Sequence, residues 1–215
     1  MNTEITTLEP EDLSEFLSDY CDFSRDTAYI ITAMARPKEN KQIAHGDMPA
    51  FRELITSEEN IEEKLRKLLT LGRNYTPKEG GDLTFRMYIT ANSRNCLKSF
   101  HLYQKELIDM NRRISDGHEE TYNHIKRIDK EWISTLQSDT NKETSKFIID
   151  IDRKSESLLD KTATDLRDRT EIEHIIETPN GYHIITEPFN YTEFDLKEDE
   201  EIEIKTDSLM FLTII

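Results

Sequence analysis

The fold of this chain is decided by residues 147–187, which read FIIDIDRKSESLLDKTATDLRDRTEIEHIIETPNGYHIITE. Residues 147–151 form a short apolar run typical of a buried strand, and residues 155–168 continue with apolar positions at helical spacing. Two strand-like runs, 172–177 and 182–187, are joined by Thr-Pro-Asn-Gly. Asn-Gly between such runs indicates a hairpin, because both residues tolerate the positive φ of a tight turn. The segment therefore predicts a strand, a helix and a β-hairpin.

The rest of the chain supplies further helices and strands, which apolar periodicity and turn residues delimit. The expected elements are a helix over 13–20, a strand over 27–35, a helix from a Thr56–Glu59 capping box to Gly72, a strand over 83–91, two helices over 97–140 with a break near Asp116-Gly117, and a strand over 209–215. This order predicts an α+β fold with a mixed sheet flanked by helices, formed by residues 1–215 as a single domain.

Composition and charge narrow the possible classes of protein. The chain is 35% hydrophobic and 33% charged, with a net charge of −16. Residues 1–25 and 187–207 account for −6 and −7 of this charge, which leaves −3 for residues 26–186. An acidic chain lacks the basic footprint of a general nucleic-acid binder, although a local basic groove or metal-assisted phosphate binding stays compatible with it.

Targeting signals and cysteines also limit the classes of protein to which the chain can belong. No apolar run approaches the ~20 residues of a membrane span, and the N-terminus lacks the basic start and apolar core of a signal peptide. The two cysteines, Cys21 and Cys96, exclude a disulfide scaffold and a four-cysteine zinc site. We therefore expect a cytoplasmic protein that does not contact a membrane.

Two aspartates at the end of the 147–151 strand, Asp150 and Asp152, are the first candidates for chemistry. Side chains at i and i+2 share a face, roughly 7 Å apart. Carboxylates held so close repel each other unless a cation or a proton intervenes. A pair of divalent ions would relieve this repulsion and hold a triphosphate, and oxygen ligands favour Mg²⁺ or Mn²⁺ over zinc. The alternative is a solvated strand end whose acids pair with Arg153 and Lys154.

Further polar residues lie at strand positions where they could contact a ligand. His183 follows the hairpin glycine by two residues, on a strand expected beside that of Asp150, and an imidazole there can donate to a phosphate oxygen. A structural, hydrogen-bonded histidine is the alternative. Arg94 could fork onto a phosphate and Asn92 could bond a sugar or base, or the two could simply close a strand exit. A small basic cluster follows the 27–35 strand and consists of Arg36, Lys38 and Lys41. It is either a solvated loop or a contact to a nucleic-acid backbone.

Three sequence motifs occur in a fixed order along the chain: YITANSR (88–94), IIDID (148–152) and ETPNGYHII (177–185), with helical segments between them. The series resembles the archaeo-eukaryotic primase superfamily, including its small viral, plasmid and bacterial primase-polymerase members, over about residues 84–190. Those proteins carry Asp-x-Asp or Asp-x-Glu on a strand, a helix, a small-residue-x-His hairpin, and then another metal-binding acid. The resemblance implies an RRM-like catalytic core that joins nucleoside triphosphates on a DNA or RNA template with Mg²⁺ or Mn²⁺, in contact with replication proteins.

The resemblance also assigns roles by position. The implied metal ligands are Asp150, Asp152 and, as the third acid in preference to Asp195 or Asp199, Asp207. The implied nucleotide contacts are His183, Asn92 and Arg94, with His183 on the triphosphate. The chain departs from the family where Gly181 replaces the Ser of many members, and where residues 97–140 form a helical insertion between two motifs.

These departures and the net charge keep a second hypothesis open. In it, the chain is a catalytically silent primase-like protein that binds a nucleotide, a nucleic acid or a protein partner as a replication accessory factor or regulator. A third hypothesis, a structural interaction protein, would use the acidic ends and the helices over 97–140.

Overall fold

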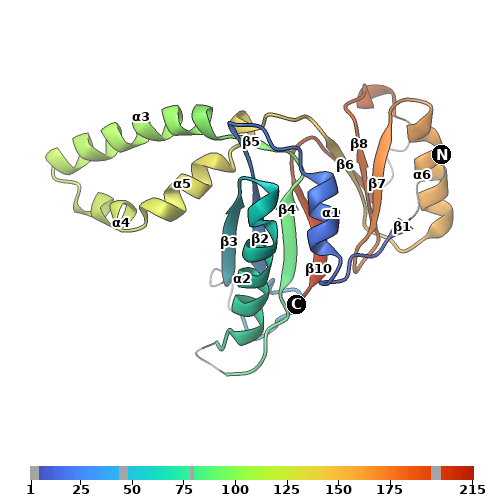
Figure 1. Cartoon of the computed structure of the whole chain (residues 1–215), viewed down its shortest axis with the longest axis horizontal. Coiled ribbons are helices and arrows are strands. Elements are labelled where there is room, and N and C mark those ends of the chain that lie inside the picture. The colour runs from blue at the N-terminus through green and yellow to red at the C-terminus, as the bar shows by residue number, and fades with distance from the viewer. Residues whose placement is uncertain (1–4, 44–47, 78–79, 195–199) are drawn as a thin grey trace.

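The computed structural model describes residues 5–43, 48–77, 80–194 and 200–215, and it contains two β-sheets, helices packed against them and a projecting helical arm (Figure 1). The expected α+β class, with helices flanking β-structure, is confirmed. The single mixed sheet that we expected is instead divided into two sheets, here called sheet I and sheet II.

Sheet I is built around residues 147–187. Its strands, in spatial order, are β1 (Ile5–Thr6), β7 (Ile172–Glu177), β8 (Tyr182–Thr186), β6 (Phe147–Ile151) and β9 (Ile202–Lys205). The β1–β7 pair is parallel and the other pairs are antiparallel, so this sheet is mixed. Helix α6 (Glu156–Arg167) starts at Ser155, whose hydroxyl accepts the Leu158 N–H, and it buries Leu159 and Leu166 against the sheet.

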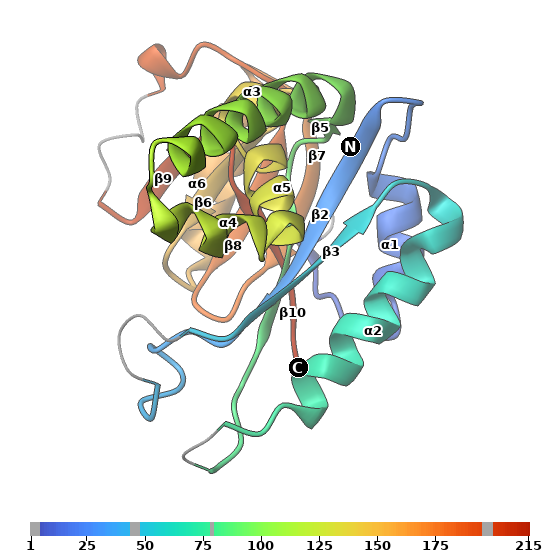
Figure 2. The same ribbon diagram turned by 90° about the vertical axis from the view of Figure 1, so that its left-hand side faces the viewer.

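Sheet II is antiparallel. Its strands, in spatial order, are β10 (Leu209–Ile214), β4 (Arg86–Thr90), β2 (Thr27–Met34) and β3 (Ala50–Ile55), and the short β5 (Arg94–Asn95) also pairs with β2. Helices α1 (Leu13–Tyr20) and α2 (Ile61–Asn74), with the 3₁₀ turn η1 (Glu58–Asn60) before α2, lie together along one side of this sheet (Figure 2).

The two faces of sheet I have different partners, because side chains alternate along each strand. Ile149 and Ile151 of β6 belong to the cluster under α6. Ile148, on the other face, joins Ile176 and Ile185 in the main core, which α1, α2 and sheet II also form. One step further along β6 on this second face comes Asp150, so the face changes there from apolar core to polar surface.

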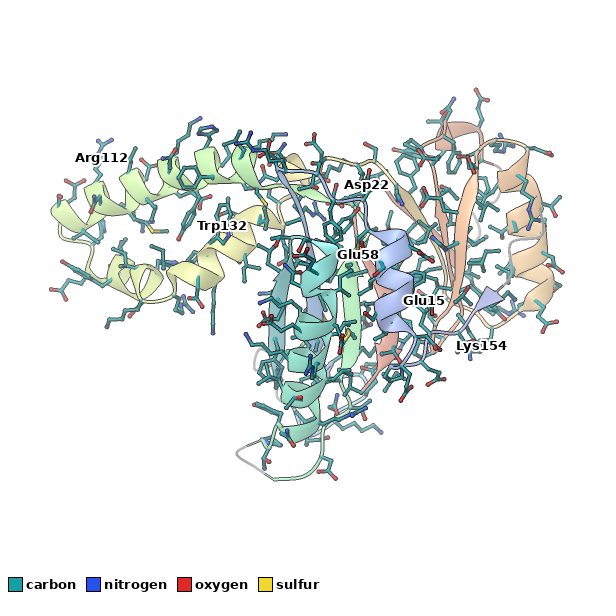
Figure 3. All side chains as sticks on the ribbon, viewed as in Figure 1. Glu15, Asp22, Glu58, Arg112, Trp132 and Lys154 are labelled. Atoms are coloured by element: carbon teal, nitrogen blue, oxygen red, sulfur yellow. The ribbon has the colours of Figure 1, made fainter. Side chains whose placement is uncertain are left out.

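The arm consists of α3 (Cys96–Ser115), η2 (Glu119–Thr121), α4 (Tyr122–Ile125), α5 (Ile128–Leu136) and η3 (Asp139–Asn141), and it extends away from both sheets (Figure 1). The predicted break near Asp116-Gly117 is confirmed, because α3 ends at Ser115 and Gly117 has φ 89°. Trp132 lies between α3 and α5 (Figure 3). The centroid of its ring is 5.7 Å from that of Tyr103, and this contact holds α3 against α5. None of the described helices combines the length and apolarity that crossing a bilayer requires.

Several local expectations were wrong. Strands β1, β3, β5 and β9 were not predicted, because β1 and β5 are two residues long, charged residues interrupt β3, and β9 is four residues long and continues an acidic run. Gly72 does not end its helix, which continues to Asn74. The expected capping box is absent, and the amide of Asn60 instead donates to the Thr56 hydroxyl at 2.8 Å. A last 3₁₀ turn, η4 (Tyr191–Glu193), follows β8.

Candidate active site

A cleft of about 340 Å³ lies between sheet I and sheet II. Sheet I and the loops that follow its strands contribute Asp150, Asp152, His183 and Lys205 to its lining. Sheet II and the loop after β2 contribute Arg36, Lys38, Arg86, Tyr88 and Phe211. Its volume is within the range of small-molecule sites. Three residues selected from the sequence, Asp150, Asp152 and His183, are thus brought together.

Strand register places the polar residues of sheet I around Asp150. His183 of β8 and Glu203 of β9 lie directly opposite Asp150 on its two sides, and directly opposed residues share a face. The Nε2 atom of His183 lies 3.4 Å from Oδ1 of Asp150, and Nζ of Lys205 lies 2.5 Å from Oδ2. The same ammonium lies 3.0 Å from Oε2 of Glu203. Asp152 follows on the same side of the chain and is exposed.

The ring of His183 is oriented by sheet II. The backbone N–H of Phe211 in β10 donates to Nδ1 of His183 at 3.3 Å. A ring nitrogen that accepts a hydrogen bond carries no proton, so the proton of the neutral ring lies on Nε2, toward Asp150. This contact fixes the tautomer and also joins the two sheets at the cleft.

Asp150 remains ionised although it is largely buried. Burial, the largest single influence, would raise the pKa of Asp150, but its contacts with His183 and Lys205 together outweigh burial and lower the pKa to about 2. Burial likewise opposes the charge of Lys205, and its bonds to Asp150 and Glu203 raise the pKa of its ammonium despite that. The pairing with Arg153 and Lys154 that we considered does not occur, since these residues pair with Glu201 and Glu177.

The opposite wall of the cleft is basic. Arg36 donates from Nη1 to the Tyr88 hydroxyl at 3.3 Å, and this hydrogen bond raises the pKa of Arg36 further. Arg86 is buried, and its Nη2 lies 2.5 Å from Oε1 of Glu39. With Lys38 and Lys205, four basic residues line the cleft; Arg86 is paired with Glu39 and Lys205 with Asp150 and Glu203, so Arg36 and Lys38 make the wall of sheet II positive in a chain of net charge −16.

Asn92, Arg94 and Asp207 lie together but outside the cleft lining. The guanidinium of Arg94 donates to both carboxylate oxygens of Asp207, at 2.7 and 2.8 Å, and both side chains are buried. Asn92 is fully buried, donates to the Lys146 carbonyl at 3.0 Å and accepts the Lys146 N–H at 2.6 Å. The structure therefore gives these three residues contacts with protein groups at the base of the arm. Asp195 and Asp199, considered as alternatives to Asp207, lie outside the described residues.

Gly181 is required for a reason other than the one we expected. A Cβ at this position would lie 1.8 Å from the Ile151 carbonyl oxygen, because the hairpin loop passes directly over the end of β6. Positive φ is recorded among the described residues only at Gly80, Gly81 and Gly117, so the Asn-Gly pair does not form the positive-φ turn that we predicted. The close approach excludes Ser at this position with the present backbone.

The donor set suits a hard cation. Asp150, Asp152 and Glu203 offer carboxylate oxygens only, the ligands that Mg²⁺ and Mn²⁺ prefer. A cationic group already lies between two of them, because the ammonium of Lys205 contacts both Asp150 and Glu203. Within the part of the chain that the structure describes, no three His, Cys, Asp or Glu side chains are gathered as a ready metal cage. A divalent ion would thus fit the chemistry of these donors after a rearrangement of side chains.

Sequence reasoning missed Glu203, Lys205 and Arg86. The signal for the first two was the alternation of Ile202, Glu203, Ile204 and Lys205, which is typical of a strand with one polar face. It was obscured because this run continues the acidic stretch over 187–207, which we considered only for its charge.

Comparisons of the chain with protein-family models, with curated proteins and with solved structures gave no match.

Proposed function

We propose that this chain is a template-dependent nucleotidyltransferase of the primase-polymerase type, which joins nucleoside triphosphates on a DNA or RNA template. One observation carries the proposal: Asp150, Asp152 and His183 meet in a cleft whose facing wall is basic. Asp150 of β6 lies directly opposite His183 of β8, and Asp152 follows the end of β6, which agrees with the order of motifs that the resemblance implies.

The basic wall supports binding of a triphosphate. The overall field of an acidic chain repels a polyanion, so the affinity must come from local cations. Arg86 shares its charge with Glu39, and Arg36 and Lys38 therefore carry most of the positive charge of this wall. A planar guanidinium such as that of Arg36 can donate two hydrogen bonds to one phosphate group.

His183 is available as a donor to the same ligand. Its Nε2 lies 3.4 Å from Asp150, at the long limit of an N–H···O bond, so a phosphate oxygen that enters the cleft beside this nitrogen can share the proton without a rotation of the ring. Asp150 and Asp152 provide negative charge close to that phosphate, and a divalent ion is needed to offset it. When bound, Mg²⁺ or Mn²⁺ would supply charge neutralisation and activation of the attacking 3′-hydroxyl.

A second candidate is a nucleotide-binding protein without catalysis, in which the cleft recognises a nucleotide for a replication accessory or regulatory role. The position of Lys205 favours it, because its ammonium already neutralises Asp150 and Glu203. Such a cleft binds phosphates through its cations and has no need of a divalent ion.

Nucleotide incorporation tests the proposal. Purified protein with Mn²⁺, nucleoside triphosphates and a primed or unprimed template should extend the primer or make short oligonucleotides, and the Asp150→Ala/Asp152→Ala variant should lose this activity. The matched control is Asp160→Ala/Asp168→Ala, which removes the same charge from exposed positions. Wild-type protein that incorporates no nucleotide with Mg²⁺ or Mn²⁺ would count against the enzyme.

Calorimetry separates the two candidates. For the enzyme, nucleotide binding should weaken when chelator is added or when both aspartates are replaced. Binding that is unaffected by either change, without incorporation, would favour the silent protein.

A further inference from the structure

We propose that Lys205 is a built-in cation that competes with a divalent ion for Asp150 and Glu203, and that it keeps the metal affinity of the free cleft low. The inference deepens the proposed function and rests on it only for the identity of the competing ion. The observation behind it is a single ammonium shared by two carboxylates on neighbouring strands.

The strand pattern gives Lys205 this position. Glu203 lies opposite Asp150, and Lys205 lies opposite Ile148, the previous residue on the same face of β6. The lysine stem therefore runs along that face toward Asp150, and its Nζ reaches Oδ2 of Asp150 at 2.5 Å and Oε2 of Glu203 at 3.0 Å. Solvent has access to this arrangement, because the side chains of Lys205 and Glu203 are 27% and 67% exposed.

Competition follows from the chemistry of the two cations. A protonated lysine has no lone pair to offer a metal, so it cannot become a ligand while it keeps its charge. A divalent ion placed between the same oxygens would also be repelled by an ammonium within a few ångströms. The flexible four-carbon stem allows Lys205 to turn away. Metal binding must therefore include the loss of two ammonium–carboxylate contacts, which lowers the apparent affinity.

The test measures Mn²⁺ binding to the full chain without nucleotide, from the loss of the free-ion electron paramagnetic resonance signal. Lys205→Met keeps most of the apolar stem and removes the charge, and it should bind Mn²⁺ at least tenfold more tightly than wild type. Adding Asp150→Asn to Lys205→Met should abolish this gain. Circular dichroism and a thermal melt establish that each variant is folded.

Two control variants distinguish the removal of the competing ammonium from a change in the overall charge of the protein. Lys205→Arg keeps a cation at this position and should bind Mn²⁺ as weakly as wild type. Lys154→Met removes the same charge from a lysine that pairs with Glu177 rather than with Asp150, and it should change the affinity by less than threefold. If Lys205→Met misfolds, Lys205→Gln replaces it in the same series.

The outcomes also distinguish this inference from the proposed function. Lys205→Met binding no tighter than Lys154→Met, including no detectable binding by either variant, would overturn the competition even if wild-type protein incorporates nucleotides with excess Mn²⁺. Tight, Asp150-dependent binding by Lys205→Met supports the competition even if no variant incorporates a nucleotide, a result that would contradict the enzyme alone.

Discussion

At the scale of single residues, Gly181 is the position where the backbone leaves no room for a side chain. Any side chain there meets the carbonyl of Ile151 and the N–H of Arg153, both of which are backbone and cannot move aside cheaply. We expect Gly181→Ser to lower the free energy of unfolding by about 2–4 kcal/mol, because the hairpin must shift away from β6. Chemical denaturation followed by circular dichroism measures this loss.

The matched control is Gly72→Ala. Gly72 lies inside α2, and the nearest atom to an added Cβ is the flexible Cδ1 of Ile215 at 3.3 Å. Because Ala favours a helix interior by roughly 0.5–1 kcal/mol, this variant should be about as stable as wild type or slightly more stable. Equal stability of Gly181→Ser and wild type would show that the hairpin does not approach β6 as closely as described.

Cys21 predicts how the protein responds to alkaline pH. Burial raises the pKa of its thiol from the ordinary value of 9.0 to about 12. Between these values the unfolded chain has lost the proton and the folded chain keeps it. The buried neutral thiol therefore contributes fully to the free energy of unfolding below pH 9. This contribution is lost as the pH rises toward 12, by about 1.4 kcal/mol per pH unit. Denaturant unfolding from pH 8 to 11 should show a shallower alkaline decline for Cys21→Ala than for Cys96→Ala, whose thiol is less buried. Identical slopes for the two variants would contradict this assignment.

At the scale of elements, the pair of Arg94 and Asp207 joins the base of the arm to the chain entering β10. Their side chains are 3% and 9% exposed, so removing one partner leaves the other charge buried and unpaired. We expect Asp207→Asn to lower the free energy of unfolding by about 3–5 kcal/mol and to leave nucleotide binding by the folded protein unchanged. Urea denaturation and calorimetry measure the two effects.

An exposed pair provides the comparison for this prediction. Glu62 and Arg66 on α2 are 79% and 71% exposed, and Glu62→Gln should cost less than about 1 kcal/mol. If Asp207→Asn keeps its stability but loses metal or nucleotide binding, Asp207 belongs to the site as the resemblance implied, and the structural role given to it here is wrong.

Local elements could be predicted from the sequence where their signals are local. The strand, helix and hairpin over 147–187 follow from apolar periodicity and from the Pro-Asn-Gly turn, and they appear in the structure as β6, α6, β7 and β8. Strand β9 escaped prediction because its alternation is only four residues long and continues an acidic run. Short edge strands of this kind acquire their identity from the neighbour they pair with, in this case β6.

At the scale of the whole molecule, the arrangement of the strands depends on pairing between segments that are distant in the sequence, and it could not be predicted from the sequence. The division into two sheets depends on β10 joining β4 and on β9 joining β6, and nothing in the local pattern selects these partners. The same holds for the buried polar residues: Arg94 finds its carboxylate 113 positions away, so its sequence pattern was equally compatible with a phosphate ligand. Asp150 and His183 lie on β6 and β8, which a helix and a strand separate in the sequence, so their pairing was expected from the order of the motifs and the resemblance rather than from a local pattern.

The distribution of charge belongs to this scale as well. The chain carries a net charge of −16, and yet the cleft between the sheets is lined by four basic residues against two aspartates. A chain that repels polyanions in general but gathers cations on one wall of a cleft favours a small, multiply charged ligand over extended non-specific binding. A nucleoside triphosphate with its divalent ion has this character.

We propose that this cleft holds a metal-bound nucleoside triphosphate between the acids of sheet I and the basic wall of sheet II. Anomalous diffraction from crystals grown with Mn²⁺ and a non-hydrolysable triphosphate tests it most directly. We expect a manganese peak at the carboxylates of Asp150 and Asp152, with phosphate density beside Arg36 and His183. A nucleotide bound outside the cleft, or a manganese peak remote from both aspartates, would contradict it.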